Sequence, residues 1–178
     1  MSAAPAFLVG TSGYSFDDWV GPFYPPGTPR QRFLETYARH FDCVEINATH
    51  YRIPSPHTFE RMAQRTPPAF RFIVKLHGAV THERVLDPAQ VRAFHDAVAP
   101  LAAAGKHHGM LAQFPWGFRR DEAAKAHLVR MRAAFPEGPL WVEFRHDSWM
   151  HPHLPEWLRA HGLGYCAVDE PALPGLVP

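Results

Sequence analysis

The sequence has little cysteine, little lysine and no long apolar run. Its two cysteines, Cys43 and Cys166, are too few for a disulfide framework and too far apart for a metal-binding Cys-x-x-Cys pair. No segment approaches the roughly 18 apolar residues that span a membrane. The first ten residues contain neither Lys nor Arg, unlike a secretory signal. We therefore expect a reduced, cytoplasmic protein with no membrane partner.

Neither sign of charge dominates. Eighteen basic and 17 acidic residues leave a formal charge of +1, whereas proteins that hold nucleic acids mainly through phosphates carry a clear basic excess. Apolar residues make up 46% of the chain and charged residues 20%, the mixture of an ordinary globular protein. The length of 178 residues suits one core. We predict a single domain over residues 1–178. A nearly neutral net charge remains compatible with a small cationic pocket.

Prolines and glycines divide the sequence into short segments that alternate between strand and helix character. The expected strands are Phe7–Gly10, Cys43–Asn47, Phe70–Leu76, His108–Phe114, Leu140–Arg145 and Gly164–Asp169. The expected helices are Pro29–Phe41, Ser55–Arg65, Pro88–Ala104, Asp121–Phe135 and His153–His161. Alternating strands and helices predict a parallel sheet, because parallel neighbours need a crossover connection.

Two parallel architectures compete, an open doubly wound sheet and a TIM-type (β/α)8 barrel. The first loop has no GxGxxG or GxxxxGK[ST] motif, so the nucleotide-binding open sheet has no support. Barrel enzymes instead collect chemistry from the carboxyl ends of many strands. Nearly every expected strand here has a polar residue at or next to its carboxyl end, which favours the barrel.

The polar strand ends predict the candidate site. Residues two apart on a strand share a face, so Glu143 lies with Arg145 and Glu45 with Asn47. The residues expected at one rim are Glu45, Asn47, Lys75, Gln113, Glu143, Arg145 and Asp169, followed in the loops by His77, His82 and His146. The alternative is that these charges form a structural salt-bridge network. The loop aromatics expected to line or cover a pocket are Trp19, Phe23, Tyr24, Trp116 and Trp149.

The sequence predicts no metal site. Carboxylates and histidines in one cavity could hold a divalent cation, but the chain has no HExxH motif or other local ligand run. Lys75 and Arg145 would repel a cation and suit a phosphate or carboxylate. Ser12 and Ser148 lack the GxSxG context of a hydrolase nucleophile. The cofactor is left unassigned.

Several short motifs follow one another in a characteristic order. They are Gly10–Tyr14, Trp19–Pro25, Phe41–Asn47, Phe70–Lys75 with His82, Gln113–Pro115, Glu143–His146 with Trp149, and Asp169. In this order they resemble the YecE-like family, the domain of unknown function numbered 72, over about Phe7 to Pro171. The resemblance implies a TIM barrel and leaves the chemistry open. Trp116 and Asp147 depart from it, since the family commonly has proline at both positions.

The resemblance also bears on the length of the chain. Family members continue past a sixth strand with further strand and helix units, whereas this sequence ends at Pro178. Six strands cannot close an eight-stranded barrel. We expect an incomplete barrel of about six βα units, truncated after the sixth strand, with an exposed edge there.

The favoured function is an enzyme that acts on a small anionic or polar substrate at the carboxyl ends of the strands. Glu143, or as second choice Glu45, would be the general base or acid, assisted by His82 or His146, and Lys75 and Arg145 would hold charge. The candidate substrate-binding residues are Ser12, Tyr14, Asn47, Gln113, Arg145, His146, Trp149 and Asp169. Hydrolase, lyase and isomerase chemistry all stay open. The alternatives are a barrel that binds or processes nucleic acid and a non-catalytic ligand-binding barrel; the oligomeric state is unassigned.

Overall fold

The computed structural model describes residues 7–169, 171 and 173–177, and in them six strands form one parallel sheet. The strands are β1 (Gly10–Ser12), β2 (Cys43–Ile46), β3 (Arg71–Lys75), β4 (His107–Gln113), β5 (Leu140–Glu143) and β6 (Gly164–Tyr165). Each strand pairs in parallel with the next one along the chain. This sequential order is that of a TIM barrel and confirms the predicted fold class.

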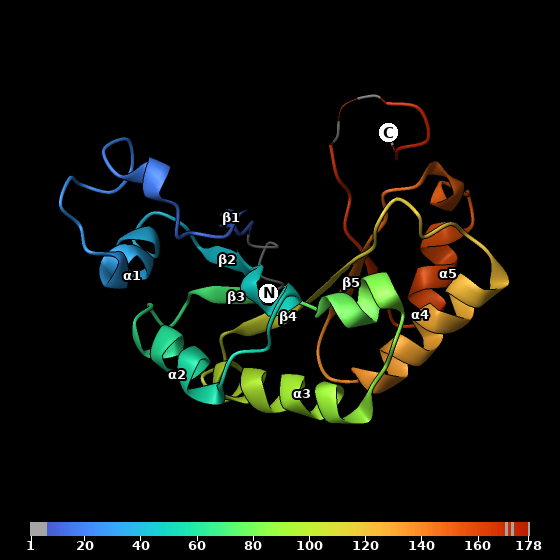
Figure 1. The fold of residues 1–178 in the computed structure, drawn as a ribbon, viewed down its shortest axis with the longest axis horizontal. Helices are drawn as coiled ribbons and strands as arrows, with labels where there is room; N and C mark the ends of the chain where they lie inside the picture. The colour runs from blue at the N-terminus through green and yellow to red at the C-terminus, as the bar shows by residue number, and fades with distance from the viewer. Residues whose placement is uncertain (1–6, 170, 172, 178) are drawn as a thin grey trace, which may run out of the picture.

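Helices connect the strands on one side of the sheet. They are α1 (Phe33–Tyr37), α2 (Pro56–Gln64), α3 (Pro88–Ala103), α4 (Glu122–Ala134) and α5 (Leu154–Ala160). Figure 1 shows them along the convex side of the curved sheet, so that the concave side is left free of helices. Within the described residues β1 pairs only with β2, and β6 only with β5. The sheet is therefore an unclosed barrel of six strands and five connecting helices in the described residues, in agreement with the expected incomplete barrel.

The two faces of the sheet differ as the alternation of residues predicts. Val44, Val74 and Val142 are fully buried in the core beneath the helices. The residues that follow them in sequence point the other way, because neighbouring side chains on a strand alternate between faces. Polar side chains at the strand ends are consequently displayed on the concave side.

Some expected elements are shorter in the structure. The helix expected over Pro29–Phe41 consists of a 3-10 turn over Arg30–Arg32 and the five-residue α1. Thr28, just before this segment, donates its hydroxyl to the Pro25 carbonyl oxygen at 2.7 Å and does not cap the helix. The first strand begins later than expected, at Gly10, and its register pairs Gly10 with Cys43. The Cys43 carbonyl oxygen would lie 2.1 Å from a Cβ at Gly10, so this position requires glycine. The sixth strand has only two residues.

A buried lysine joins α2 to the start of β4. Lys106 is 6% exposed, and its ammonium donates to the carbonyl oxygens of Ala63 at 2.5 Å and Thr66 at 2.7 Å. A third hydrogen bond runs to the Thr66 hydroxyl at 3.0 Å. The last carbonyls of a helix have no partner within it, so Lys106 satisfies those that end α2.

Two aromatic residues expected at a pocket lie in the core. Trp149 is fully buried, with its ring stacked on Phe144 at 4.1 Å between centroids. Its indole N–H donates to the Phe118 carbonyl oxygen at 2.7 Å, which satisfies the polar end of the ring. Tyr24 is also fully buried and stacks on Phe33 at 4.1 Å. The prediction that these two rings line a pocket is wrong, because both are fully enclosed by the residues of the core.

The indole of Trp141 lies on the concave face, near the amino end of β5. Trp141 on β5 lies between Gly109 of β4 and Gly164 of β6. A Cβ would lie 2.5 Å from the indole at Gly109 and 2.3 Å from it at Gly164. Any side chain larger than hydrogen would collide with the ring, so the two glycines create the space for Trp141.

Candidate functional site

Four polar side chains form a continuous chain of contacts across three neighbouring strands. The Lys75 ammonium donates to Oε1 of Gln113, and Nε2 of Gln113 donates to Oε1 of Glu143 at 2.6 Å. Arg145 forms an ion pair with the same Glu143 oxygen at 2.5 Å. The sequence predicted that these four residues meet at one rim, and the structure brings them together.

A second polar group lies at the ends of β1 and β2. The hydroxyl of Ser12 donates to Oε1 of Glu45 at 2.8 Å and accepts a hydrogen bond from Nδ2 of Asn47 at 2.6 Å. These three residues and Tyr14 line a cavity of about 480 Å³, which Phe59 and other apolar residues close on the α2 side. A polar strand end beside an apolar wall is typical of small-molecule sites.

Glu45 also faces a second cavity. This one has a volume of about 420 Å³ and lies on the concave face, lined by Ile73, Leu111, Trp141 and Cys166 among others. Glu45 is only partly buried, whereas the side chain of Glu143 is 6% exposed. Of the two carboxylates, Glu45 is thus the one that a ligand can reach from either cavity.

The charges of the site perturb one another. Burial lowers the pKa of Lys75, and Arg145 acts in the same direction, while Glu45 and Glu143 act against it. Burial and the nearby Glu143 raise the pKa of Cys166 to about 11. The amine of Lys75 therefore loses its proton more easily than a free lysine, and the thiol of Cys166 stays protonated at neutral pH.

Two histidines stand beside Lys75, and one of them was missed in the sequence. The rings of His50 and His82 lie 4.8 Å apart. Partial burial lowers the pKa of both, and the charge of Lys75 lowers both further. Nδ1 of His50 is buried without a hydrogen-bond partner in the described part of the chain. His50 follows Asn47 by three residues, and this position just beyond a polar strand end is the signal that could have identified it.

The remaining predicted residues do not join these contacts. His146 is 8% exposed, and its Nδ1 accepts a hydrogen bond from the Ser148 amide at 3.0 Å, which caps the following 3-10 turn. Asp169 is exposed and lies beyond the end of β6. Trp149 is enclosed in the core. Nδ1 of His77 accepts from the Ala79 amide at 3.1 Å, a local turn contact.

Two further features of the described residues concern metal sites and membrane spans. They contain no group of three or more His, Cys, Asp or Glu side chains arranged to hold a metal ion. None of their helices is both long and apolar enough to cross a bilayer.

The sequence profile of the family described as "protein of unknown function DUF72" matches residues 8–178. The chain belongs to the DUF72 family. It is 31% identical to the UPF0759 protein YunF of Bacillus subtilis over 96% of this chain and 63% of that protein. It is 30% identical to the UPF0759 protein YecE of Escherichia coli O157:H7 over 77% of this chain and 50% of that protein. The chain thus spans less than two thirds of the length of both curated relatives.

Solved structures of DUF72 proteins show the same fold. A DUF72 family protein from Thermotoga maritima is 41% identical and has a TM-score of 0.86, over 96% of this chain and 68% of that one. A second, from Enterococcus faecalis, is 24% identical with a TM-score of 0.82 over 95% of this chain and 63% of that one. The resemblance noted in the sequence is confirmed, and the DUF72 name itself assigns no activity.

Proposed function

We propose that the protein is an enzyme that transfers protons on a small anionic or polar substrate bound at the carboxyl ends of β1 to β3. The observation that carries the proposal is the position of Glu45. Its carboxylate lines both cavities, accepts a hydrogen bond from Ser12, and acts electrostatically on Lys75. A reachable carboxylate beside an amine whose pKa is lowered by burial is a usual arrangement for acid and base catalysis.

The two carboxylates have different surroundings, which suggests different roles. Glu143 is almost inaccessible and is held by Gln113, Arg145 and the Cys166 thiol. A proton taken up there would disrupt the pairing with Arg145, so Glu143 is suited to positioning its neighbours. Glu45 would be the general base or acid. This assignment reverses the order of preference that the sequence suggested.

Lys75 and the two histidines complete the proposed machinery. The ammonium of Lys75 would attract the negative group of the substrate or the negative charge that develops during reaction. His50 and His82, whose lowered pKa values keep the rings neutral at pH 7, would accept or relay a proton. Hydrolysis, elimination and isomerisation all use such steps, and the proposal covers these three classes.

The test is a panel of sugar phosphates, hydroxycarboxylates, neutral sugars and nucleosides, with turnover followed by proton NMR and binding by thermal unfolding. We expect turnover of at least one member. The variant Glu45→Gln should lower that turnover by about 100-fold or more, as expected for the loss of a general base. The matched control is Glu156→Gln, whose carboxylate on α5 is 75% exposed.

The possible outcomes separate the proposal from its alternatives. Binding without turnover would identify a non-catalytic ligand-binding barrel. Turnover that is equal in Glu45→Gln and in the Glu156→Gln control would remove Glu45 from the mechanism. No binding and no turnover across the panel would also contradict the proposal.

A further inference from the structure

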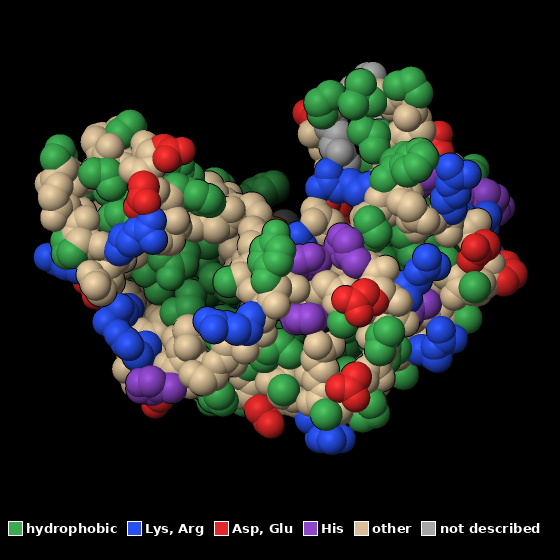
Figure 2. Space-filling view, viewed as in Figure 1, with side chains coloured by type: hydrophobic (Ala, Val, Ile, Leu, Met, Phe, Trp, Pro, Cys, Tyr) green, Lys and Arg blue, Asp and Glu red, His purple; other side chains and the backbone are tan. Residues whose placement is uncertain are grey.

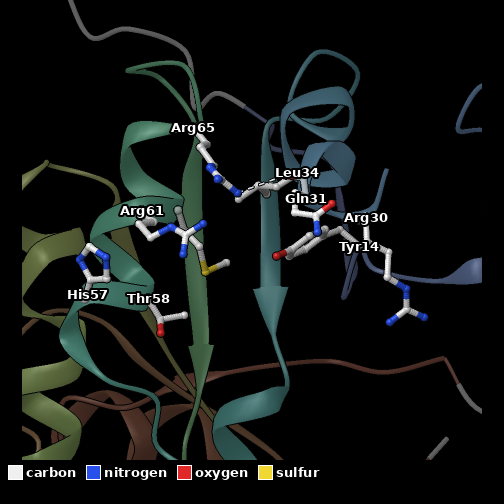
Figure 3. Close-up of a pocket in the computed structure, with 9 residues that line it drawn as sticks. Tyr14, Arg30, Gln31, Leu34, His57, Thr58, Arg61 and Arg65 are labelled. Carbon is white, nitrogen blue, oxygen red and sulfur yellow. Dashed lines mark hydrogen bonds between the residues drawn. The ribbon is translucent and has the colours of Figure 1, made fainter. Parts of the chain in front are cut away.

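A cationic pocket lies between α2 and the segment that precedes α1. It has a volume of about 210 Å³, and Figure 3 shows the residues that line it. The lining side chains are Tyr14, Arg30, Gln31, Leu34, His57, Thr58, Arg61, Met62 and Arg65. Three of them are arginines and none is acidic, although the chain as a whole is nearly neutral. Figure 2 shows Lys and Arg side chains gathered on this face over α1 and α2.

The three arginines are held differently. Arg30 forms an ion pair with the exposed Asp17, and Nη1 of Arg65 donates to the Gln31 carbonyl oxygen at 3.2 Å, which fixes α2 against the neighbouring turn. Arg61 has neither an ion pair nor a hydrogen bond within the residues that the structure describes. Its guanidinium is the group in the pocket that is free to bind a ligand.

Tyr14 supplies a second unused donor. Its hydroxyl has no hydrogen-bond partner in the described ranges, and it extends into the pocket from the side opposite Arg61 (Figure 3). Burial raises the pKa of Tyr14, while the charge of Arg65 acts against that rise. The phenol is therefore neutral at physiological pH and can donate a hydrogen bond.

An ordinary solvated arginine face does not account for this arrangement. Carboxylates three or four residues away on the same helix stabilise helix arginines, but Glu60, the carboxylate of α2, pairs with His57 at 3.0 Å. Arg61 on α2 and Arg65, the residue just after its end, line the same concavity as Tyr14. Charged donors and the Tyr14 hydroxyl meet there without a carboxylate, which is the complement of an anion with several oxygens.

The pocket adjoins the cavity that Glu45 lines. Tyr14, Thr58 and Met62 belong to the walls of both. A ligand whose anionic group contacts Arg61 can therefore extend past Tyr14 toward Ser12 and Glu45.

We propose that the Arg61 pocket binds the phosphate group of a phosphorylated small molecule, the rest of which occupies the Glu45 cavity. A phosphate monoester carries more charge and more acceptor oxygens than a carboxylate, and guanidinium groups match its geometry in pairs. The direction that the ligand takes rests on the proposed function. Binding of the phosphate does not, because it needs no catalytic step.

The experiment measures binding by isothermal titration with four probes: inorganic phosphate, glycerol 3-phosphate, glycerate and an oligonucleotide without a terminal phosphate. We expect glycerol 3-phosphate to bind more tightly than glycerate. Arg61→Gln should weaken it by about tenfold or more, and Tyr14→Phe by about fivefold, as expected for a charged and a neutral hydrogen bond. The matched control is Arg159→Gln on the exposed side of α5, which removes the same charge far from the pocket.

Three results would overturn the inference: equal binding in Arg61→Gln and Arg159→Gln, glycerate binding as tight as glycerol 3-phosphate, or preferential binding of the oligonucleotide. Because Arg61 is exposed, its substitution should leave thermal unfolding unchanged, which separates lost binding from lost folding. Turnover of an unphosphorylated substrate without phosphate binding would refute this inference alone. Phosphate binding that depends on Arg61, with turnover unaffected by Glu45→Gln, would refute the proposed function alone.

Discussion

The thiol of Cys166 donates to the carboxylate of Glu143, with Sγ 3.9 Å from Oε2. The two groups lie on the concave side of the sheet, where Cys166 follows β6 and Glu143 ends β5. Burial of the thiol, together with the negative charge of Glu143, opposes its ionisation and raises the pKa of Cys166 to about 11. The contact makes the thiol a reporter of the charge on Glu143.

The first prediction concerns the reactivity of this thiol. Cys166 in the folded chain should react with iodoacetamide far more slowly at pH 8 than it does in urea, with the rate still rising between pH 9 and pH 11. Glu143→Gln should shift that rise to lower pH. Mass spectrometry of the labelled peptides separates Cys166 from Cys43, the other thiol of the chain. A pH profile identical in the wild type and Glu143→Gln would contradict the contact.

The same raised pKa has a consequence for stability. Well below pH 9 the thiol is protonated in both the folded and the unfolded chain, so the contact contributes fully to the free energy of unfolding. Between about pH 9 and pH 11 the unfolded chain loses the proton first, so the free energy of unfolding should fall as the pH rises. Cys166→Ser, whose hydroxyl does not titrate there, should show a smaller fall in urea titrations at these pH values. A fall of equal size would assign the effect to other groups.

The second prediction concerns Lys106, which holds the end of α2. Lys106→Met keeps much of the side-chain volume but leaves the carbonyls of Ala63 and Thr66 without their donor. Because unsatisfied buried acceptors are costly, we expect a loss of about 2 kcal/mol in urea unfolding. Lys125→Met is the control, since it removes only a pair with the exposed Glu122, a kind of contact worth about 1 kcal/mol or less. Equal losses in the two variants would contradict the capping role.

The third prediction concerns the space around Trp141. Gly164→Ala should destabilise the chain by about 1–3 kcal/mol, because its Cβ would lie 2.3 Å from the indole. When Trp141→Leu is also present, Gly164→Ala should lower the free energy of unfolding much less. A double-mutant cycle measures this difference directly. Gly138→Ala is an unsuitable control because Gly138 has a positive φ of 67°. Ala103→Ser at the exposed end of α3 serves instead.

The fourth prediction concerns Gln113, which joins Lys75 to Glu143. Gln113→Met retains the length of the side chain but neither of its hydrogen bonds, and we expect a loss of about 1–3 kcal/mol. Gln64→Met at the exposed end of α2 should change stability by about 0.5 kcal/mol or less. Thermal unfolding at pH 7 compares the two, and a loss no larger than that of the control would show that the network is not structural.

The sequence predicted the strand order and the polar rim because both depend on local patterns. Alternation within a strand decides which face Glu143 occupies, and sequential parallel pairing places it next to Gln113. The rim of Lys75, Gln113 and Glu143 follows from these two rules alone. Their detailed contacts do not, because rotamers are set by the surroundings of each side chain.

Loop and helix-surface residues were less predictable. Loops have no periodicity, so nothing in the sequence distinguishes Trp149, which is buried, from Trp116, which is 47% exposed. Arg61 and Arg65 read as an ordinary exposed helix face until the position of Tyr14 across from them is known. Asp169 was expected at the rim because the sixth strand was predicted to continue to it, whereas β6 ends at Tyr165.

The amide of Gln113 has one accepting end and one donating end, and the charges on either side decide which way it turns. Its oxygen faces the Lys75 ammonium and its nitrogen faces the Glu143 carboxylate. A half-turn of the amide would set two donors against each other at Lys75 and two acceptors against each other at Glu143. The two charges thus hold the amide in one orientation, and the ends of β3, β4 and β5 are tied together by a side chain that has no charge of its own.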